Sequence, residues 1–260
     1  MKQIYILLIA LLMGLSANAE ESGTCGPDLR WHLTDDGVLT ISGKGKMYNY
    51  SLDNRAPWRG YDIKRIIIGD GITTIGSSAF RNCFALTSVT IPNSVTTIGD
   101  NAFIGCSSLT SVTIPNSVTT IGSEAFSGYT NLQKVNIGKS VKDIGEYAFD
   151  YCTSITQISS EAVVPPTCES GVFTDINKSK CKLIVPKNSL DAYKQADQWK
   201  DFLLIEDNTT GITNTVYNKA GLADVYTIDG TKRLSKASTD EINALPKGVY
   251  IVNGKKIIIK

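Results

Sequence analysis

The sequence predicts a repeat solenoid made mostly of short β-strands and turns, capped at both ends and followed by a small all-β module. One fourteen-residue string, LTSVTIPNSVTTIG, occupies both residues 86–99 and residues 109–122. Apolar residues recur every 23 positions without a gap over residues 68–159. The pattern changes to hairpin signals over residues 212–260. Self-similarity at a fixed period of this length is typical of stacked repeats.

Residues 1–19 have the form of a secretory signal peptide. Lys2 supplies a positive start, residues 4–15 are apolar, and Ala17-Asn18-Ala19 has the small residues of a cleavage site. A membrane-spanning helix is the alternative, but the run is short for a hydrocarbon core of ~30 Å. We therefore expect export and no integral membrane segment after cleavage. The mature chain would lie at the cell surface or be secreted, with the periplasm as the alternative.

Residues 20–67 are predicted to cap the amino-terminal end of the stack. Two short apolar runs, 31–33 and 38–41, flank Asp36-Gly37, which is a strong hairpin signal. Ile63 and Ile66 then supply the end of an incomplete coil. A cap is needed because the end of a solenoid would otherwise leave its core open to water.

Each 23-residue register is predicted to form one coil of short strands and corners. Residues 109–114 alternate at their end like a strand with one buried face. Pro115 ends the pairing because proline has no N–H to donate. Residues 118–122 predict a second extended piece, and the following turn directs Phe126 inward. The four registers are 68–90, 91–113, 114–136 and 137–159.

A single coil is not expected to fold alone. About eight inward apolar groups would contribute ~1.5–3 kcal/mol each. Ordering the backbone costs ~1–2 kcal/mol for every residue of the coil. Stacked coils cover one another's apolar faces, so equivalent residues of successive coils must pack together. The residues predicted to form the shared core are Phe80, Phe103, Phe126, Phe149, Ile75, Ile98, Ile121 and Ile144.

Six cysteines in an exported chain raise the question of disulfides. Cys83, Cys106 and Cys152 share one repeat position, where the remaining copy has Tyr129. A position that accepts tyrosine predicts a buried hydrophobic slot with free, packed thiols. The candidate disulfide joins two cysteines outside the repeats, Cys168 and Cys181, and Cys25 has no obvious partner.

The carboxyl-terminal part is predicted to contain a cap, a linker and a separate module. Residues 160–206 would form a partial repeat followed by a helix, with Asn188 or Ser189 as its N-cap. Residues 207–211 read as a linker. Residues 212–260 predict a small all-β module, because two strand-like runs flank Asn253-Gly254.

The repeat resembles the BspA-type leucine-rich repeats of bacterial surface proteins. The resemblance lies in the pattern Ile-Pro-x-Ser-Val-x-x-Ile-Gly-x-x-Ala-Phe-x-x-Cys-x-x-Leu over residues 68–159. It implies a leucine-rich-repeat fold and adhesion to host matrix proteins, host cells or other bacteria. The run Leu-Pro-Lys-Gly-Val-Tyr-Ile-Val-Asn-Gly-Lys-Lys, at 245–256, resembles the sorting domains of proteins secreted by Gram-negative bacteria. A structural appendage is the alternative for that module.

The sequence offers little for catalysis, cofactors or metals. The lone histidine, His32, lies in the cap hairpin, where a structural role is expected, so a histidine base for serine or cysteine chemistry is not indicated. No residue cluster matches a phosphate loop, a zinc site or a calcium site. After cleavage the chain has 25 basic and 25 acidic residues, so its charge does not favour nucleic acid. We expect a protein that is not an enzyme and holds no cofactor.

The surface of the repeats is the predicted functional feature. The four coils hold only ten charged residues, and threonines occupy their outward strand positions. A threonine suits any exposed strand, so one alone predicts nothing. In register, they predict a hydroxyl ladder that binds by many weak hydrogen bonds. The candidate partner-binding residues are Thr74, Thr97, Thr120 and four anchors expected to be exposed, Phe84, Ile104, Tyr147 and Tyr151.

These observations predict an exported, non-enzymatic binding protein. Its partners would be host or bacterial surface proteins or glycans, with a cell-surface adhesin or host-interaction protein as the leading class. The alternative is a structural scaffold of the envelope or periplasm that assembles through its own repeats.

Overall fold

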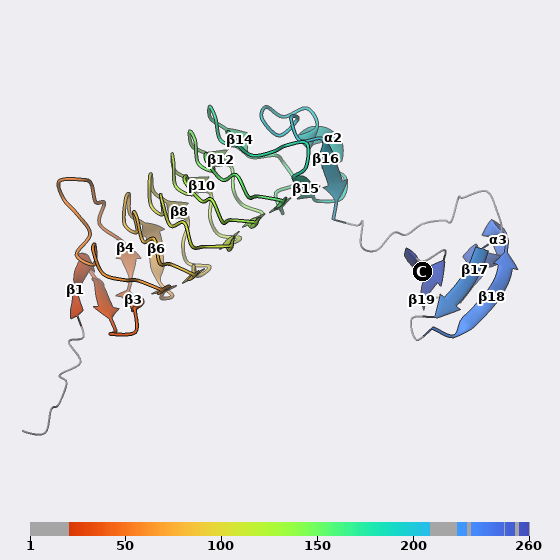
Figure 1. The fold of residues 1–260 in the computed structure, drawn as a ribbon, viewed down its shortest axis with the longest axis horizontal. Coiled ribbons are helices and arrows are strands. Elements are labelled where there is room, and N and C mark those ends of the chain that lie inside the picture. Colours follow the sequence, from red (N-terminus) through yellow and green to blue (C-terminus); the bar gives the residue numbers. More distant parts are fainter. Residues whose placement is uncertain (1–20, 209–222, 228–229, 247, 253–254, 260) are drawn as a thin grey trace, which may run out of the picture.

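The computed structural model of the chain describes residues 21–208, 223–227, 230–246, 248–252 and 255–259. Figure 1 shows a β-solenoid of stacked coils and a small antiparallel sheet near the carboxyl terminus, which confirms the predicted fold class. The expected signal peptide, most of the expected linker and Asn253-Gly254 lie outside the described residues.

Three sheets run along the solenoid. The first contains β1 (Glu21–Gly26), β2 (Leu29–Leu33), β3 (Val38–Gly43), β5 (Arg65–Ile68) and β7 (Ser88–Thr90). The second contains β4 (Gly45–Lys46), β6 (Ile72–Ile75), β8 (Thr97–Ile98), β10 (Thr120–Ile121), β12 (Asp143–Ile144) and β14 (Thr167–Cys168). The third contains β9 (Ser111–Ile114), β11 (Lys134–Ile137), β13 (Gln157–Ser160), β15 (Lys182–Val185) and β16 (Leu204–Asp207).

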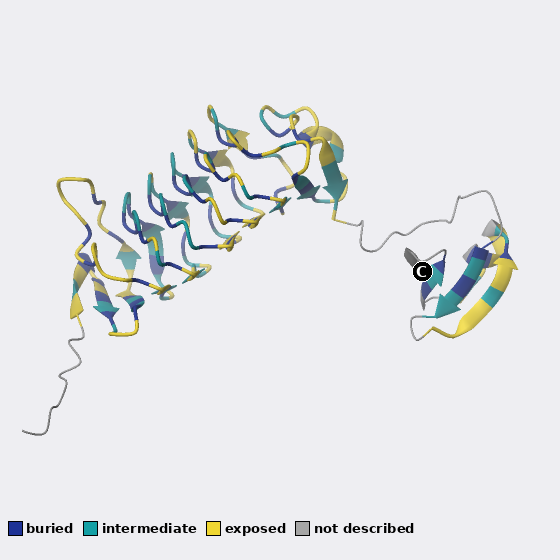
Figure 2. Ribbon diagram, viewed as in Figure 1, coloured by how far each residue is buried: buried dark blue, intermediate teal, exposed yellow. Residues whose placement is uncertain are grey.

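Strands of successive coils pair in parallel and in the register of the repeat. Lys134 lies opposite both Ser111 and Gln157, each 23 residues away. Thr120 lies opposite Thr97 and Asp143 at the same interval. Parallel strands lie ~4.8 Å apart, so equivalent side chains of neighbouring coils form columns. Figure 2 shows buried residues on the inside of the coils and exposed ones on the outside.

A turn segment completes each coil and also pairs with its neighbour. The Phe103 N–H donates to the Ala125 carbonyl at 2.9 Å, although neither residue is in a strand. Left-handed backbone recurs at two positions of this segment. The first has φ between 52° and 57° in all four coils, and the second has φ between 53° and 85°. Since the side chains differ while the conformation does not, stacking imposes it. These eight residues are Ser78, Asn101, Glu124, Tyr147, Asn82, Gly105, Gly128 and Tyr151.

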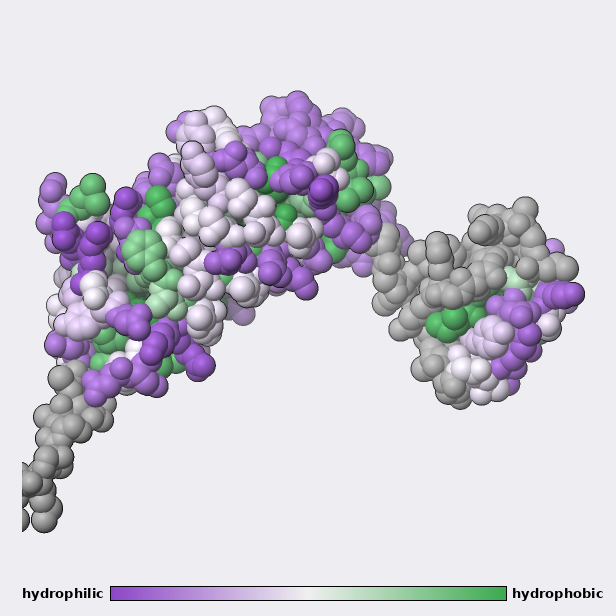
Figure 3. Space-filling view, in the orientation of Figure 1, coloured by the Kyte–Doolittle hydropathy of each residue, from purple (hydrophilic) through white to green (hydrophobic). Residues whose placement is uncertain are grey.

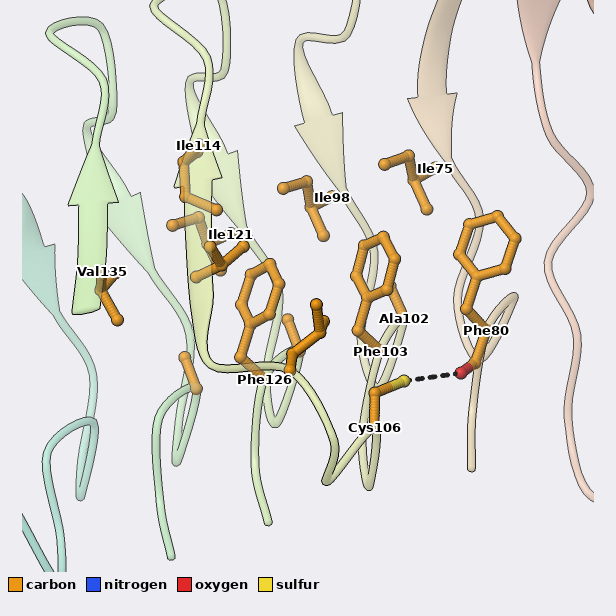
Figure 4. Close-up of a cluster of buried hydrophobic side chains, with 14 of the residues drawn as sticks. Ile75, Phe80, Ile98, Ala102, Phe103, Cys106, Ile114, Ile121, Phe126 and Val135 are labelled. Carbon is orange, nitrogen blue, oxygen red and sulfur yellow. Dashed lines mark hydrogen bonds between the residues drawn. The ribbon is translucent and has the colours of Figure 1, made fainter. Parts of the chain in front are cut away.

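The core contains one continuous column of aromatic rings, part of which Figure 4 shows. Phe80 and Phe103 stack with ring centroids 5.1 Å apart, and Phe126 follows at 5.4 Å. Phe149 lies 5.5 Å beyond Phe126. Trp58 extends the column at its amino-terminal end, 5.6 Å from Phe80. The isoleucines expected beside the rings are fully buried: Ile75, Ile98, Ile121 and Ile144.

The repeat position shared by cysteine and tyrosine is more than a hydrophobic slot. The Cys106 thiol donates to the Phe80 carbonyl at 3.2 Å (Figure 4). The Tyr129 hydroxyl makes the equivalent bond to the Phe103 carbonyl at 2.8 Å. Cys152 repeats the thiol version one coil later. The position therefore accepts both residue types because each supplies a buried hydrogen-bond donor to the preceding coil.

Pairing between the first and third sheets stops at β7 and resumes at β9. Gln133 and Thr156 donate their N–H groups to Thr110 and Gln133, the corresponding residues of the preceding coils, at 2.8 and 3.0 Å. Among the described residues, the N–H of Thr110 has no such bond to Thr87. Val89, beside the gap, is only partly buried, whereas its equivalent Val112 is fully buried. The interruption lies within the duplicated fourteen-residue string, so the local sequence does not cause it.

The amino-terminal end is closed by the hairpin that the sequence predicts. Strands β2 and β3 pair antiparallel with Trp31 opposite Ile41, and β3 then pairs in parallel with β5. Trp31 and Tyr50 both contact the Trp58 ring edge-on, at 5.9 and 5.7 Å between centroids. Edge-on rings cover the first face of the aromatic column.

The stack continues beyond residue 159 through one more coil. Phe173 follows Phe149 in the column at 6.1 Å, and β15 pairs with β13. The expected helix shrinks to α2 (Leu190–Tyr193), and the Ser189 side chain bonds the Val163 carbonyl at 2.8 Å instead of capping it. Strand β16 pairs with β15 and forms the last strand of the third sheet. Trp199 meets Phe173 edge-on at 4.7 Å.

The carboxyl-terminal sheet has the order β18-β17-β19-β20. Its strands are β17 (Ala223–Thr227), β18 (Lys232–Ala237), β19 (Gly248–Val252) and β20 (Lys255–Ile259). β19 and β20 form the expected antiparallel hairpin, with Val252 opposite Lys255. The module is not all-β, because α3 (Thr239–Asn243) follows β18. Ser238 and Glu241 form a capping box at its start.

The prediction of a disulfide between Cys168 and Cys181 is wrong. All six cysteines are free thiols. Cys168 ends β14 in the second sheet, whereas Cys181 directly precedes β15 in the third. The two residues lie on different sides of one coil, so the disulfide geometry of neighbouring Cβ atoms is not available to them.

Candidate binding surface

The predicted threonines form a column on the outer side of the second sheet. Thr97 lies directly opposite both Thr74 and Thr120. Asp143 and Thr167 continue the column on β12 and β14. Parallel pairing places these side chains at intervals of ~4.8 Å. The register of the repeat therefore brings together the hydroxyls that the sequence selected.

The two threonines of each strand differ in what their hydroxyls do. Thr96 and Thr119 each donate to the backbone carbonyl of the preceding coil at 3.1 Å. Within the described part of the chain, the hydroxyls of Thr74, Thr97 and Thr120 have no hydrogen-bond partner. All three residues are half-buried. A free hydroxyl can both donate and accept, so this column offers paired donor and acceptor sites to a ligand.

An open groove of about 650 Å³ adjoins the carboxyl-terminal end of this column. Asp143 and Thr167 line it together with Val163 and Val164. The two valines are adjacent in the sequence and 66% and 77% exposed, so they form a small apolar patch. Hydroxyls along a flat face and apolar side chains at its end provide the polar and apolar parts of a protein-binding surface.

The four aromatic and aliphatic anchors do not belong to that face. Phe84, Tyr147 and Tyr151 lie on the turn segments and are exposed. Phe84 is in the first 23-residue register and the tyrosines are in the fourth, about 14 Å away along the stack at the parallel-strand spacing. The structure therefore does not join the threonines and the anchors into one patch. Whether any of these residues binds a partner stays a prediction.

Ile104 is half-buried, so the expectation that it is exposed is wrong. Its repeat position lies between neighbouring coils, and the equivalent residues Arg81 and Asp150 are half-buried as well. Backbone pairing holds the position in place, because the Asn82 N–H donates to the Ile104 carbonyl at 2.8 Å.

Sequence reasoning missed a groove near the amino-terminal end. Arg59, Tyr61, Asp62, Asn82 and Phe84 line an open space of about 390 Å³. Tyr61 and Phe84 are 44% and 61% exposed. Arg59 and Tyr61 come from the segment between β4 and β5, where the pattern of the 23-residue repeat is incomplete.

The thiols do not form nucleophilic sites. Burial raises the pKa of Cys25, Cys152 and Cys168 to about 12, and that of Cys181 to about 11. The neutral thiol is a poor nucleophile and a poor metal ligand. Among the described residues, no group of three or more His, Cys, Asp and Glu side chains could hold a metal ion. No helix of that part is long and apolar enough to cross a membrane.

Figure 3 shows a pale area of intermediate hydropathy on the middle of the coils, with hydrophilic residues around it. Together with the parallel register and the buried ring column, the coils define a leucine-rich-repeat solenoid. The match to a known family makes this more specific: six copies of the BspA type leucine-rich repeat region match residues 58–178. Residues 58–178 of the chain are therefore BspA-type leucine-rich repeats.

Solved structures of bacterial leucine-rich repeat proteins also match parts of the chain. One from T. pallidum is 26% identical, with a TM-score of 0.43, over 63% of this chain and 81% of that one. One from Eubacterium ventriosum is 23% identical, with a TM-score of 0.37, over 65% and 67%. A leucine-rich cell surface protein from Faecalibacterium prausnitzii is 23% identical, with a TM-score of 0.28, over 58% and 57%. A search of curated protein sequences found no significant match.

Proposed function

We propose that the chain is an exported, non-enzymatic binding protein that acts at the cell surface as an adhesin or host-interaction protein. The signal-peptide pattern of residues 1–19 supports export. The observation that carries the binding role is the column of Thr74, Thr97 and Thr120, whose unpartnered hydroxyls lie in strict register. The partner is a host or bacterial surface protein or glycan.

The column and its adjoining groove suit a partner that lies along the stack. Each hydroxyl can form a hydrogen bond of ~0.5–1.5 kcal/mol. Because the three threonines between Lys46 and Asp143 carry no charge, their desolvation on binding costs little. Val163 and Val164 supply exposed apolar area where the column ends. The partner would gain polar contacts from the ladder and apolar burial from the groove.

The test is capture of a partner by the immobilised mature chain on an array of matrix proteins and glycans. The triple variant Thr74→Val, Thr97→Val, Thr120→Val keeps the side-chain shape and removes three hydroxyls. We expect it to lose roughly tenfold or more in affinity. The matched control is Thr90→Val, an exposed threonine on β7 in the first sheet. No retention across the array, or equal binding by the triple variant, would contradict the proposal.

A self-assembling scaffold is the second candidate, because β16 is a sheet edge. Leu203 and Leu204 are exposed there, and an open edge can pair with another strand. The ion pair of Lys182 with Glu206, at 3.2 Å, places charge on the same edge and opposes such pairing. Size-exclusion chromatography at several concentrations decides between the two. A concentration-dependent oligomer that Leu204→Lys abolishes would favour the scaffold.

A further inference from the structure

Three arginines from different parts of the chain surround one small hollow at the amino-terminal end of the repeats. Arg55 and Arg59 come from the segment between β4 and β5, and Arg81 comes from the turn of the first 23-residue register. The other polar residues of the lining include Ser51, Tyr61, Ser78 and Asn82. No aspartate or glutamate is among the described residues that line this hollow. The site is therefore strongly positive in a protein whose repeats are nearly uncharged.

The guanidinium of Arg81 is incompletely satisfied. Its Nη1 donates to Asn101 Oδ1 at 3.3 Å, but its Nε–H is buried and has no hydrogen-bond partner. None of the three arginines forms an ion pair with a carboxylate of the described residues. A buried unsatisfied donor on a charged group is costly. An anionic group in the hollow would neutralise the cluster.

The size of the hollow selects among anions. Its volume is about 20 Å³, which is room for one or two water-sized atoms. A planar carboxylate can present its two oxygens there, and guanidinium groups bind a carboxylate in a bidentate manner. A phosphate or sulfate ester, with three terminal oxygens, requires more space. The geometry therefore favours a carboxylate.

The hollow shares Arg59, Tyr61 and Asn82 with the groove of about 390 Å³ described above. A group bound to the arginines would therefore continue into that groove between Tyr61 and Phe84. Their exposed rings offer flat apolar surfaces. Asp62 and Asn82 offer acceptors and donors for hydroxyl groups beside the rings. This combination matches a pyranose ring, which has apolar C–H faces and a hydroxyl-bearing rim.

We propose that this cleft binds a saccharide that carries a carboxylate, with the carboxylate in the arginine hollow and the sugar ring between Tyr61 and Phe84. An extended peptide would pair its backbone with a free strand edge, whereas this groove is lined by side chains. A sugar therefore suits the groove better than an extended peptide. The inference is independent of the threonine column, which lies on the second sheet. A chain that fails to bind through the threonines would still bind the acidic sugar here.

The experiment follows the Arg81 Nε–H signal by NMR in the full mature chain labelled with nitrogen-15 arginine. The probes are a linear trisaccharide of galacturonic acid, its methyl-esterified form, sodium acetate and the tripeptide Gly-Gly-Phe. We expect the acidic trisaccharide to shift the signal saturably and the esterified form to bind roughly tenfold or more weakly. Arg59→Gln should lose about tenfold in affinity, and Phe84→Ala should lose less.

Two controls keep the result interpretable. Arg65→Gln removes the same charge from an exposed position on β5 outside the cleft, and should bind like the unmodified chain. The triple threonine-to-valine variant should also bind normally, which separates this site from the proposed adhesive face. The assignment is overturned if the acidic trisaccharide leaves the Arg81 signal unchanged. It is also overturned if acetate binds as tightly as the trisaccharide, or if the tripeptide binds more tightly than either.

Discussion

Replacing Phe126 by leucine tests whether the aromatic column holds the coils together. Phe126 is fully buried and lies near the middle of the column. Its ring stacks on Phe103 at 5.4 Å and on Phe149 at 5.5 Å, with interplanar angles of 8° and 6°. Leucine keeps the residue apolar but removes both stacked contacts, together with the edge contact to Tyr129 at 6.1 Å.

The expected loss follows from these contacts. An aromatic pair contributes ~0.5–1.5 kcal/mol beyond its buried area, and three pairs are lost. Because leucine refills part of the space, the cost of the shape change is ~1 kcal/mol. We expect Phe126→Leu to lower the free energy of unfolding by about 3 kcal/mol, which corresponds to roughly 6–12 °C in Tm for a domain of this size.

Urea unfolding followed by circular dichroism measures the effect, with the slope m checked for loss of two-state behaviour. Phe84→Leu is the matched control. Its ring is 61% exposed, so we expect a change within ~0.5 kcal/mol. The double variant with Phe103→Leu should show a coupling energy of ~0.5 kcal/mol or more. A Phe126→Leu chain as stable as Phe84→Leu would refute the role of the column.

Three further predictions concern single features of the coils. Tyr129→Phe removes the bond to the Phe103 carbonyl and should cost about 1 kcal/mol in urea unfolding, whereas Tyr151→Phe, on an exposed ring, should be neutral. The folded Cys152 and Cys168 thiols keep their protons to about pH 12, while unfolded thiols lose theirs near pH ~8.5. Above pH ~8.5 unfolding therefore releases protons. The contribution of the two thiols to the free energy of unfolding should be constant below pH ~8.5 and fall as the pH rises above it. A urea midpoint that stays flat up to pH 11 would contradict this. The Thr110 amide should exchange with solvent roughly tenfold faster than that of Gln133, which has the bond that Thr110 lacks. Equal rates by NMR would show that the gap between β7 and β9 does not exist in solution.

The periodic parts of the fold could be predicted because the constant spacing of the repeat fixes which residues of neighbouring coils pair. Phe80 to Phe149 recur at one interval, and stacking of equal coils turns that interval into a column. The coil with Phe173 breaks the interval, since Cys168 pairs 24 residues after Ile144 and Leu183 pairs 25 after Ile158. A search at a fixed period of 23 therefore misses it. Helix α3 had a local signal, Ser238-Thr-Asp-Glu241, which the strand pattern around it obscured.

The candidate site could be predicted only in part, and for the same reason. The threonine column follows from the register alone. Which hydroxyls stay free does not, because Thr96 and Thr97 are adjacent and identical in type, and only the first reaches a carbonyl of the preceding coil. The arginine hollow joins a non-repeating segment to the first turn, so it depends on how Arg59 and Arg81 meet in space. Arg81 occupies a variable position of the repeat motif, between Phe80 and Cys83, so the motif does not specify an arginine there.

The left-handed positions of the turn segments affect how such a protein can diversify. Those positions hold Ser, Asn, Glu, Gly and Tyr without a change of backbone, at a cost of ~1–2 kcal/mol for each residue other than glycine. The cost comes from the contact of Cβ with the following carbonyl oxygen, so several unbranched residue types can meet it. New chemistry can therefore appear at regular steps along the solenoid while its architecture is inherited unchanged. The chemistry of such repeats is free to change one side chain at a time.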